Sequence, residues 1–409
     1  MSDVTGPIAA AELLGRLGSL IECRTAANQR FFASEADRIA RLCHRMAERF
    51  ARGGRLVAFG SSPAARSDVR HVAVEFVHPV IVGKRALPAI GLSSEGGPLV
   101  AQLELVLEPD DIAIAFGAGE DGGEASEAVE LARRHGCLTI AFDRAGAEWE
   151  FCPPSDDVFV RQELAETLYH VLWELVHVFF DHRGLLSGRE ARPIHDVGAS
   201  GFLYPFLGEQ EHDLQAVIAD VRRSVVLKAN EIAGLREQTL TENRERLMGA
   251  AAALREVLDG GGKLLVLGNG GSATDAMDAV ADLRLPPRGW PPRRALDLTE
   301  DAAILTAIAN DIGPEAIFSR QIIAYGREGD AILAFSTSGN SRNIIEALAE
   351  ARRGKLVTVA LVGYDGGRVA NEGLADYAIV TRSEHIPRIQ EAQSSAWHVL
   401  RELLEELQS

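Results

Sequence analysis

The residues best suited to bind a charged ligand are those at 336–341, with the sequence STSGNS. They follow an apolar stretch at 331–335 that predicts a buried strand, and they precede a helical pattern at 342–353. Hydroxyl groups and free backbone N–H groups at a helix N-terminus favour an anion, so a phosphate is the expected ligand. A Ser-rich loop that only caps the helix is the alternative.

A second loop, at 268–272 with the sequence GNGGS, also joins a strand pattern (263–267) to a helical pattern (273–283). Its three glycines allow the backbone to approach a ligand closely. The spacing does not match the dinucleotide fingerprint G-x-G-x-x-G, and no Gly-Lys-Ser/Thr follows as in a P-loop. Two anion-binding loops without either nucleotide signature indicate a phosphorylated small molecule.

The half-chain from about 239 to 407 resembles a sugar isomerase (SIS) domain of the phosphoheptose isomerase family. The resemblance rests on GNGGSATDAMDAVADL, ILTAIANDIGPEAIFSRQ, AFSTSGNSRNIIEALAEAR, LVGYDGGRVA and RIQEAQSSAWHVL, which occur in the family's order. It implies a doubly wound, five-stranded parallel sheet that binds a sugar phosphate.

The same resemblance implies the residues of a substrate site. They come from the two loops, from a segment after an expected helix at 302–309, and from a C-terminal helix: Asn269, Gly270, Gly271, Ser272, Asn310, Asp311, Ser336, Thr337, Ser338, Asn340, Ser341 and Gln390.

Length and charge bound the class of protein. A chain of 409 residues predicts two domains. A formal net charge of −17 disfavours a nucleic-acid partner.

The N-terminus lacks a secretory pattern, and the most apolar helix candidate, 168–180, is too short and too polar to span a membrane. The four cysteines show no CxxC spacing, so we expect reduced, mostly buried thiols in a cytoplasmic protein.

The first half of the chain repeats the second. The sequence GGRLVAFG at 53–60 matches GGKLLVLG at 261–268, and DIAIAF at 111–116 matches DAILAF at 330–335. Each half begins with a long helical stretch, at about 9–52 and 211–259. We therefore predict an α/β protein of two SIS domains in tandem, at 1–182 and 209–409, joined by a linker at 183–208.

The first half has lost the loops that would bind phosphate. Residues 117–122 read GAGEDG, so the carboxylates of Glu120 and Asp121 stand where a phosphate would lie. The glycine loop has become GSSPA, and Pro63 removes a backbone donor. We expect phosphate to bind only the second half.

The first half retains a different set of polar residues. His71 and Glu75 are four apart, so they share one face of a predicted helix. The resemblance implies that His71, Glu75, Gln162 and His170 bind a divalent metal and that Glu75 and His170 are catalytic. Two imidazoles and a carboxylate favour zinc as the metal. The alternative is that this quartet is structural and that Asp282 and His398 perform all the chemistry.

The second half has Asp278, Asp282, Gln390 and His398 at the equivalent positions. Aldose–ketose interconversion through an enediol needs a base for a carbon-bound proton and an acid or metal at oxygen. The resemblance assigns these catalytic roles to Asp282 and His398. Aspartate is one methylene shorter than the glutamate of the family, which moves its carboxylate.

The surviving features are complementary, which suggests that both halves contribute to one activity. The leading hypothesis is an isomerase of sedoheptulose 7-phosphate whose metal quartet lies at an interface with the other half. The alternative is a non-catalytic phosphosugar sensor or scaffold, because some relatives of the family bind proteins instead. Since the resembled family forms tetramers, a tandem chain is expected to form a homodimer with four SIS domains.

The remaining polar and aromatic residues receive structural interpretations. His177 is expected at the surface or at an interface. Trp173 and Trp397, among apolar helical positions, are expected in the core or at an interface.

Overall fold

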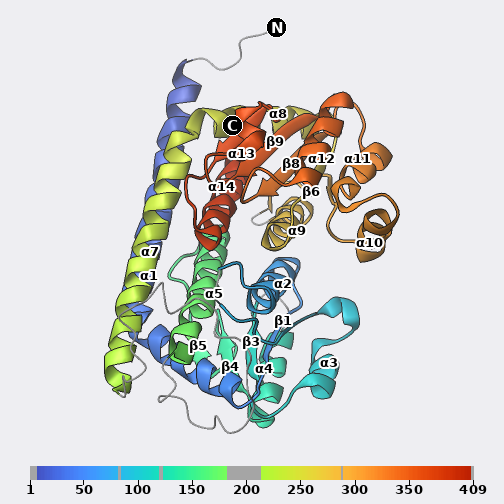
Figure 1. Ribbon diagram of the computed structural model, residues 1–409. Helices are drawn as coiled ribbons and strands as arrows, with labels where there is room; N and C mark the ends of the chain where they lie inside the picture. Colours follow the sequence, from blue (N-terminus) through green and yellow to red (C-terminus); the bar gives the residue numbers. More distant parts are fainter. Residues whose placement is uncertain (1–6, 82–83, 119–122, 182–212, 287–288, 407–409) are drawn as a thin grey trace. The chain divides into compact units, whose positions relative to one another are not determined.

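The computed structural model describes residues 7–81, 84–118, 123–181, 213–286 and 289–406 (Figure 1). The chain forms two compact units: an N-terminal unit, Ala27–Glu231, and a C-terminal unit of Ile232–Ser409 together with Met1–Ala26. Helix α1 (Pro7–Ala51) therefore contributes residues to both units. The predicted linker at 183–208 lies outside the described residues.

Each unit contains a five-stranded sheet in which all neighbouring strands are parallel. The N-terminal sheet has the order β2-β1-β3-β4-β5, with β1 (Leu56–Gly60), β2 (Ala89–Ser93), β3 (Ile112–Ala115), β4 (Leu138–Ala141) and β5 (Trp149–Glu150). The C-terminal sheet has the order β7-β6-β8-β9-β10, with β6 (Leu264–Leu267), β7 (Ala295–Asp297), β8 (Ala331–Ser336), β9 (Val357–Val362) and β10 (Tyr377–Val380). The two orders are the same, so the predicted fold class is confirmed.

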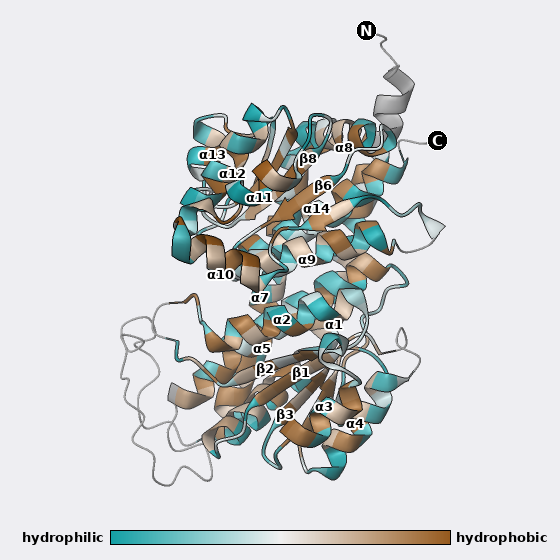
Figure 2. Cartoon of the chain, turned by 90° about the vertical axis from the view of Figure 1, so that its right-hand side faces the viewer, coloured by the Kyte–Doolittle hydropathy of each residue, from teal (hydrophilic) through white to brown (hydrophobic). Residues whose placement is uncertain are grey.

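The strands of the N-terminal sheet are apolar on both faces, as a sheet covered by helices requires. One face (Leu56, Ala58, Ile112, Ile114) packs in a core with α1, α2 (Pro63–Val77), α5 (Val158–Asp181) and the start of α7 (Leu214–Glu242). The other face packs with α3 (Leu99–Val106), which follows the short 3₁₀ turn Ser94–Gly96, and with α4 (Glu124–Arg134). Figure 2 shows the hydrophobic colour of the residues of β1 and β3.

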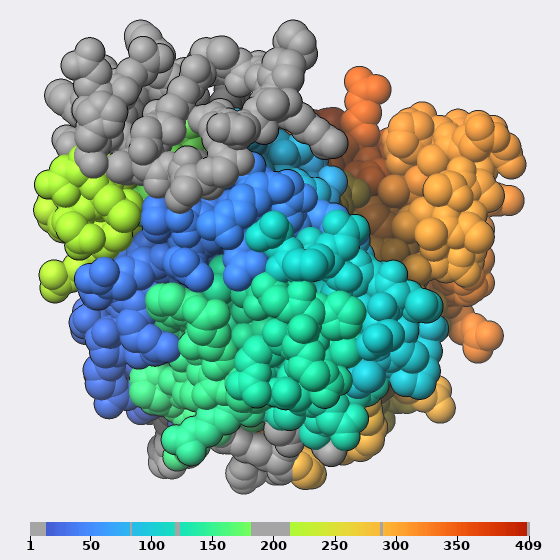
Figure 3. Space-filling view, turned by 90° about the horizontal axis from the view of Figure 1, so that it is seen from below, coloured from blue at the N-terminus to red at the C-terminus, as the bar shows by residue number. Residues whose placement is uncertain are grey.

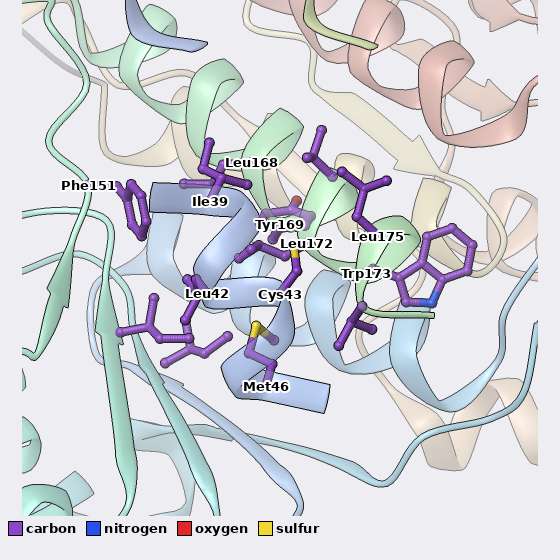
Figure 4. Close-up of a cluster of buried hydrophobic side chains, with 14 of the residues drawn as sticks. Ile39, Leu42, Cys43, Met46, Phe151, Leu168, Tyr169, Leu172, Trp173 and Leu175 are labelled. Carbon is purple, nitrogen blue, oxygen red and sulfur yellow. The ribbon is translucent and has the colours of Figure 1, made fainter. Parts of the chain in front are cut away.

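The core between α1 and α5 is built from side chains spaced three and four residues apart. Figure 4 shows side chains of α1 in one hydrophobic cluster with side chains of α5; those from α1 are Ile39, Leu42, Cys43 and Met46. Arg38, on the outer side of α1, donates a hydrogen bond to the carbonyl oxygen of Glu150 (3.0 Å). In Figure 3, atoms of α1 (blue) adjoin atoms of the part of the chain that contains β5 (green) at the surface.

The C-terminal sheet is covered in the same way. One face packs against α8 (Arg244–Asp259), α9 (Gly271–Arg284) and α14 (Ile386–Glu406), and the other against α11 (Ser319–Tyr325) and α12 (Arg342–Arg353). Shorter elements complete the unit: α10 (Ala302–Asp311), a 3₁₀ turn at Pro314–Ala316 and α13 (Gly367–Asn371). Trp173 and Trp397 are buried, as expected from their apolar surroundings.

The helical stretch expected at 211–259 is two helices, because α7 ends and α8 begins around Asn243. The buried amide of Asn243 donates to the carbonyl oxygen of Val380 (2.9 Å) and accepts from the N–H of Val380 (3.0 Å). Asn243 thus satisfies the backbone of strand β10 with its side chain, and this tertiary contact fixes where the helix breaks.

All four cysteines are free, but only Cys43 and Cys137 are buried. The expectation of mostly buried thiols is therefore wrong for Cys23 and Cys152, which are exposed. Within the described residues, no helix is both long enough and apolar enough to cross a membrane.

Candidate active site

The two loops singled out in the sequence follow neighbouring strands of the C-terminal sheet. Strand β6 pairs with β8, the chain continues from β6 to the outer strand β7, and β9 lies on the other side of β8. The β6–β8 boundary is therefore the point at which the strand order reverses. In doubly wound sheets, ligands bind at the carboxyl ends of the strands at such a point. The glycine loop and the STSGNS loop both begin there.

The STSGNS loop is built to present hydroxyl hydrogens. Ser336 Oγ accepts from the N–H of Gly339 (3.1 Å), and Ser338 Oγ accepts from the N–H of Asn340 (3.1 Å). A hydroxyl that accepts still has its own hydrogen to donate. Among the described residues around α12, the hydroxyl of its N-cap residue, Ser341, makes no capping hydrogen bond. The phosphate-binding role of this loop, and the alternative of a loop that only caps the helix, both stay predictions.

The shape of this loop depends on glycines that allow close backbone approach. Gly339 has φ 61°, and a Cβ atom there would lie 2.2 Å from the carbonyl oxygen of Gly366. A Cβ atom at Gly363 would lie 2.3 Å from the carbonyl oxygen of Thr337. The segment after β9 therefore packs directly against the STSGNS loop and supports it.

The side chain of Asn340 is used inside this arrangement. Its Nδ2 donates to the carbonyl oxygen of Ser338 (3.0 Å), and its Oδ1 accepts from the N–H of Arg368 (3.0 Å). Asn340 thus holds the loop in shape, and a direct substrate contact by its side chain stays a prediction.

The glycine loop leads directly into α9. Gly270 has φ 57°, Gly271 begins α9, and Ser272 is buried at the first turn. Asn269 is exposed, and its amide pairs with the amide of Asn343, a residue that the sequence analysis did not single out. No local pattern marks Asn343, because its partner is distant in the chain.

The other predicted substrate residues lie on two helices. Asn310 and Asp311 end α10, are exposed, and are joined by a hydrogen bond from Asn310 Nδ2 to Asp311 Oδ1 (2.8 Å). Gln390 is buried on α14. One turn further along α14, Gln393 donates to the carbonyl oxygen of Ser336 (3.3 Å). Helix α14 is thereby fixed to the STSGNS loop.

The predicted acid–base residues of the C-terminal unit converge, and all are buried. His398 Nε2 lies 3.3 Å from Asp278 Oδ2 and 3.8 Å from Asp282 Oδ2. The indole N–H of Trp397 donates to the same oxygen of Asp282 (2.8 Å). Burial, and then the charge of Asp278, raise the pKa of Asp282 from 3.8 to about 7, against the opposing effects of His398 and Trp397. A carboxyl group that titrates near neutral pH is suited to proton transfer.

The N-terminal unit brings together three residues of the predicted metal quartet. His71 and Glu75 lie on α2 and His170 on α5, all buried, with ligand atoms within 4.8 Å of one another. The Nε2 atoms of His71 and His170 are 3.3 Å apart, and His71 Nε2 is 3.9 Å from Glu75 Oε1. Two nitrogens on one tetrahedral zinc ion are about 3.3 Å apart, because Zn–N bonds are about 2.0–2.1 Å long. The donor set therefore fits zinc.

The fourth predicted ligand, Gln162, is half-buried on α5, eight residues before His170. Its part in metal binding stays a prediction. Glu120 and Asp121 lie outside the described residues. The serine that remains in this half's glycine loop, Ser62, is used as a helix cap: its Oγ accepts from the N–H of Ala65 (3.1 Å), and Pro63 begins α2.

The fold defines a class of protein: those built from SIS domains. The SIS domain family matches residues 229–363. The whole chain resembles solved structures of the same fold at low identity. One is the C-terminal domain of a glucosamine-fructose-6-phosphate aminotransferase from Francisella tularensis (TM-score 0.59, 9% identity, 95% of this chain and 94% of that one). Another is the tagatose-6-phosphate ketose/aldose isomerase of Escherichia coli (TM-score 0.56, 14% identity, 95% and 92%).

Within that class, the chain belongs to the phosphoheptose isomerase family. It is 44% identical to the phosphoheptose isomerase of Geobacter sulfurreducens over 164 residues, which cover 39% of this chain and 84% of that protein. It is 41% identical to the phosphoheptose isomerase of Pelodictyon phaeoclathratiforme over 179 residues, covering 43% and 84%. The protein is thus a sugar-phosphate isomerase.

Proposed function

We propose that this protein interconverts sedoheptulose 7-phosphate and an aldoheptose 7-phosphate through an enediol. The observation that carries this proposal is the STSGNS loop, whose hydroxyl groups stand at the N-terminus of α12 and at the strand-order reversal of the sheet. The same unit holds the buried group of Asp278, Asp282 and His398. The names of the matched relatives support a heptose phosphate as the substrate.

The substrate phosphate would accept hydrogen bonds from Ser336, Ser338 and Ser341 and from backbone N–H groups of α12. The positive end of the helix dipole favours its charge. The sugar would extend toward the glycine loop, where Asn269 lies. Binding the phosphate at a fixed loop uses a non-reacting part of the substrate to orient the reacting carbons.

Asp282 would remove a proton from C1 of the ketose, while His398 gives a proton to the oxygen on C2, which forms the enediol. Asp282 would then deliver its proton to C2, and the hydroxyl on C1 would return a proton to His398 as the aldehyde forms. The protons balance, and both residues end as they began. A pKa of Asp282 near 7 suits both directions, because base and acid forms coexist at neutral pH.

We also propose that His71, Glu75 and His170 hold zinc in the N-terminal unit, with Gln162 as the fourth ligand. Bound zinc supplies a Lewis acid that polarises an oxygen atom. The three converging side chains are the support for this part of the proposal. Comparing Glu75→Gln with Asp282→Asn separates a catalytic part for this centre from a structural one. If only Asp282→Asn abolishes turnover and no metal binds at His71, the proposal that the quartet takes part in the chemistry is contradicted.

Assembly and location complete the proposal. We infer a cytoplasmic homodimer, which would contain four SIS domains, and light scattering at micromolar concentration tests it. A strict monomer would contradict the inferred assembly.

The test of the proposed reaction is a turnover assay of the full chain with sedoheptulose 7-phosphate, with and without added zinc. Wild type should produce the aldose.

Ser338→Ala should weaken binding of the sugar phosphate by about tenfold or more, because a hydrogen bond to a charged group contributes about 1.5–3 kcal/mol. Ser34→Ala, an exposed serine in the other unit, is the control. Tight binding without turnover would instead support the non-catalytic alternative. Two equivalent sites per chain would contradict binding to the second half alone.

A further inference from the structure

Asn269 and Asn343 form a reciprocal amide pair between the two loops of the site. Asn269 Nδ2 donates to Asn343 Oδ1 (3.0 Å), and Asn343 Nδ2 donates to Asn269 Oδ1 (2.8 Å). Asn343 Oδ1 also accepts from the N–H of Ile344 (3.0 Å). Because both amides donate and accept, the pair fixes the orientation of each side chain.

The pair joins the start of α12 to the turn that precedes α9. Asn343 is the second residue of α12, two positions after Ser341, so it moves with the phosphate-binding end of that helix. Asn269 lies between Gly268 and Gly270, and glycines leave a backbone with wide conformational freedom. The backbone of Asn269 is held because its carbonyl oxygen accepts from the N–H of Ser272 (3.0 Å), and the hydrogen bonds to Asn343 add a fixed orientation of its exposed side chain. Asn343, as part of α12, therefore orients the side chain of Asn269 in the glycine loop.

The internal repeat provides a comparison within the same chain. Asn269 follows Gly268 as Ser61 follows Gly60, and Asn343 lies eight residues after Phe335 as Glu124 lies eight residues after Phe116. Glu124 is used differently, because its Oε1 accepts from the backbone N–H of Leu99 (2.8 Å). The amide pair occurs in the half that keeps the hydroxyl loop, and its residues are replaced in the half that has lost it.

We propose that Asn343 is a positioning residue for the isomerase reaction. It holds Asn269 against the N-terminus of α12, so that the sugar-side loop has a fixed place relative to the bound phosphate. This inference rests on the proposed phosphate site. A ligand that is only a phosphate does not need the pair, whereas a sugar phosphate that spans both loops does.

A double-mutant cycle on the full chain tests this role, with Asn343→Ala, Asn269→Ala and the double variant. We expect Asn343→Ala to lower kcat/KM for sedoheptulose 7-phosphate by about tenfold in the wild-type background. In the Asn269→Ala background, the same change should have less than about a twofold effect, because the amide pair through which Asn343 acts on the glycine loop is already absent. The Kd of inorganic phosphate, measured by calorimetry, should change by less than about twofold in Asn343→Ala. Asn371→Ala, an exposed asparagine of α13, is the matched control.

Equal effects of Asn343→Ala in both backgrounds would overturn the positioning role, because a general structural contribution is additive. So would a loss of inorganic phosphate binding as large as the loss in kcat/KM. If wild type binds neither inorganic phosphate nor the sugar phosphate, the proposed phosphate site is wrong, and the positioning role is wrong with it. If wild type binds and turns over the sugar phosphate, failure of the cycle overturns the positioning role alone.

Discussion

Replacing Asp282 by Asn should remove a large pH dependence of stability. In the folded protein the pKa of Asp282 is raised to about 7, chiefly by burial and then by the charge of Asp278. The unfolded chain has an ordinary aspartate pKa near 3.8. Between these values the folded state holds a proton that the unfolded state has released. The free energy of unfolding therefore falls as pH rises through this window.

The magnitude follows from the size of the shift. Each pKa unit corresponds to about 1.4 kcal/mol, so the whole window costs the folded state about 4 kcal/mol at pH 8 relative to pH 3. Between pH 5 and pH 8 the expected part is about 3 kcal/mol. Asparagine resembles the protonated carboxyl group, and its amide oxygen still accepts from Trp397. Asp282→Asn should thus be stabilised relative to wild type by more at pH 8 than at pH 5.

Urea denaturation of both proteins at pH 5, 6, 7 and 8, followed by circular dichroism, measures this difference. Asp259→Asn is the control, because the hydrogen bond from Arg293 holds the pKa of Asp259 below its ordinary value and the group stays ionised throughout this range. Its difference from wild type should not change with pH. If the curves for Asp282→Asn and wild type run parallel from pH 5 to pH 8, the raised pKa of Asp282 is refuted.

Three further changes test other parts of the site and the fold. Gly339→Ala should weaken phosphate binding by about tenfold or more, since the new Cβ would lie 2.2 Å from the carbonyl oxygen of Gly366. Gly329→Ala, at a position that also has a positive φ (91°) but has open space for the Cβ, should leave phosphate binding unchanged in calorimetry. Trp397→Phe removes a hydrogen bond that stabilises the Asp282 carboxylate, so the midpoint of the pH–kcat/KM profile should move upward; an unchanged midpoint would count against Asp282 as the base. Burial, and then the charge of Lys84, lower the pKa of His177 to about 4, against the opposing effect of the carbonyl groups of Trp173 and Arg85 beside its ring nitrogens. The unfolded chain therefore takes up this proton first as pH falls below 6.5, and wild type should lose up to about 3 kcal/mol of stability by pH 4, a loss that His177→Gln lacks in acid denaturation.

Local patterns along the chain were sufficient to predict the strands, the two loops and the internal repeat. Apolar runs such as 331–335 are buried on both faces of a parallel sheet, and this burial leaves a continuous hydrophobic pattern that can be read locally. Glycines and hydroxyl residues at 268–272 and 336–341 mark the strand-to-helix loops for equally local reasons. Spacing on a helix also placed His71 and Glu75 on one face.

Contacts between residues that are distant in the chain could not be predicted from such local patterns. His177 was expected at the surface or at an interface, but its ring is buried, with nitrogens 2.8 Å from the carbonyl oxygen of Trp173 and 3.1 Å from that of Arg85. The helix break at Asn243 depends on strand β10. The pKa of Asp282 depends on burial among α9 and α14, and the use of Asn343 depends on Asn269 in the neighbouring loop at the same edge of the sheet. A side chain's own type and neighbours do not encode such partners, because burial and hydrogen bonding are set by the elements that the fold brings together.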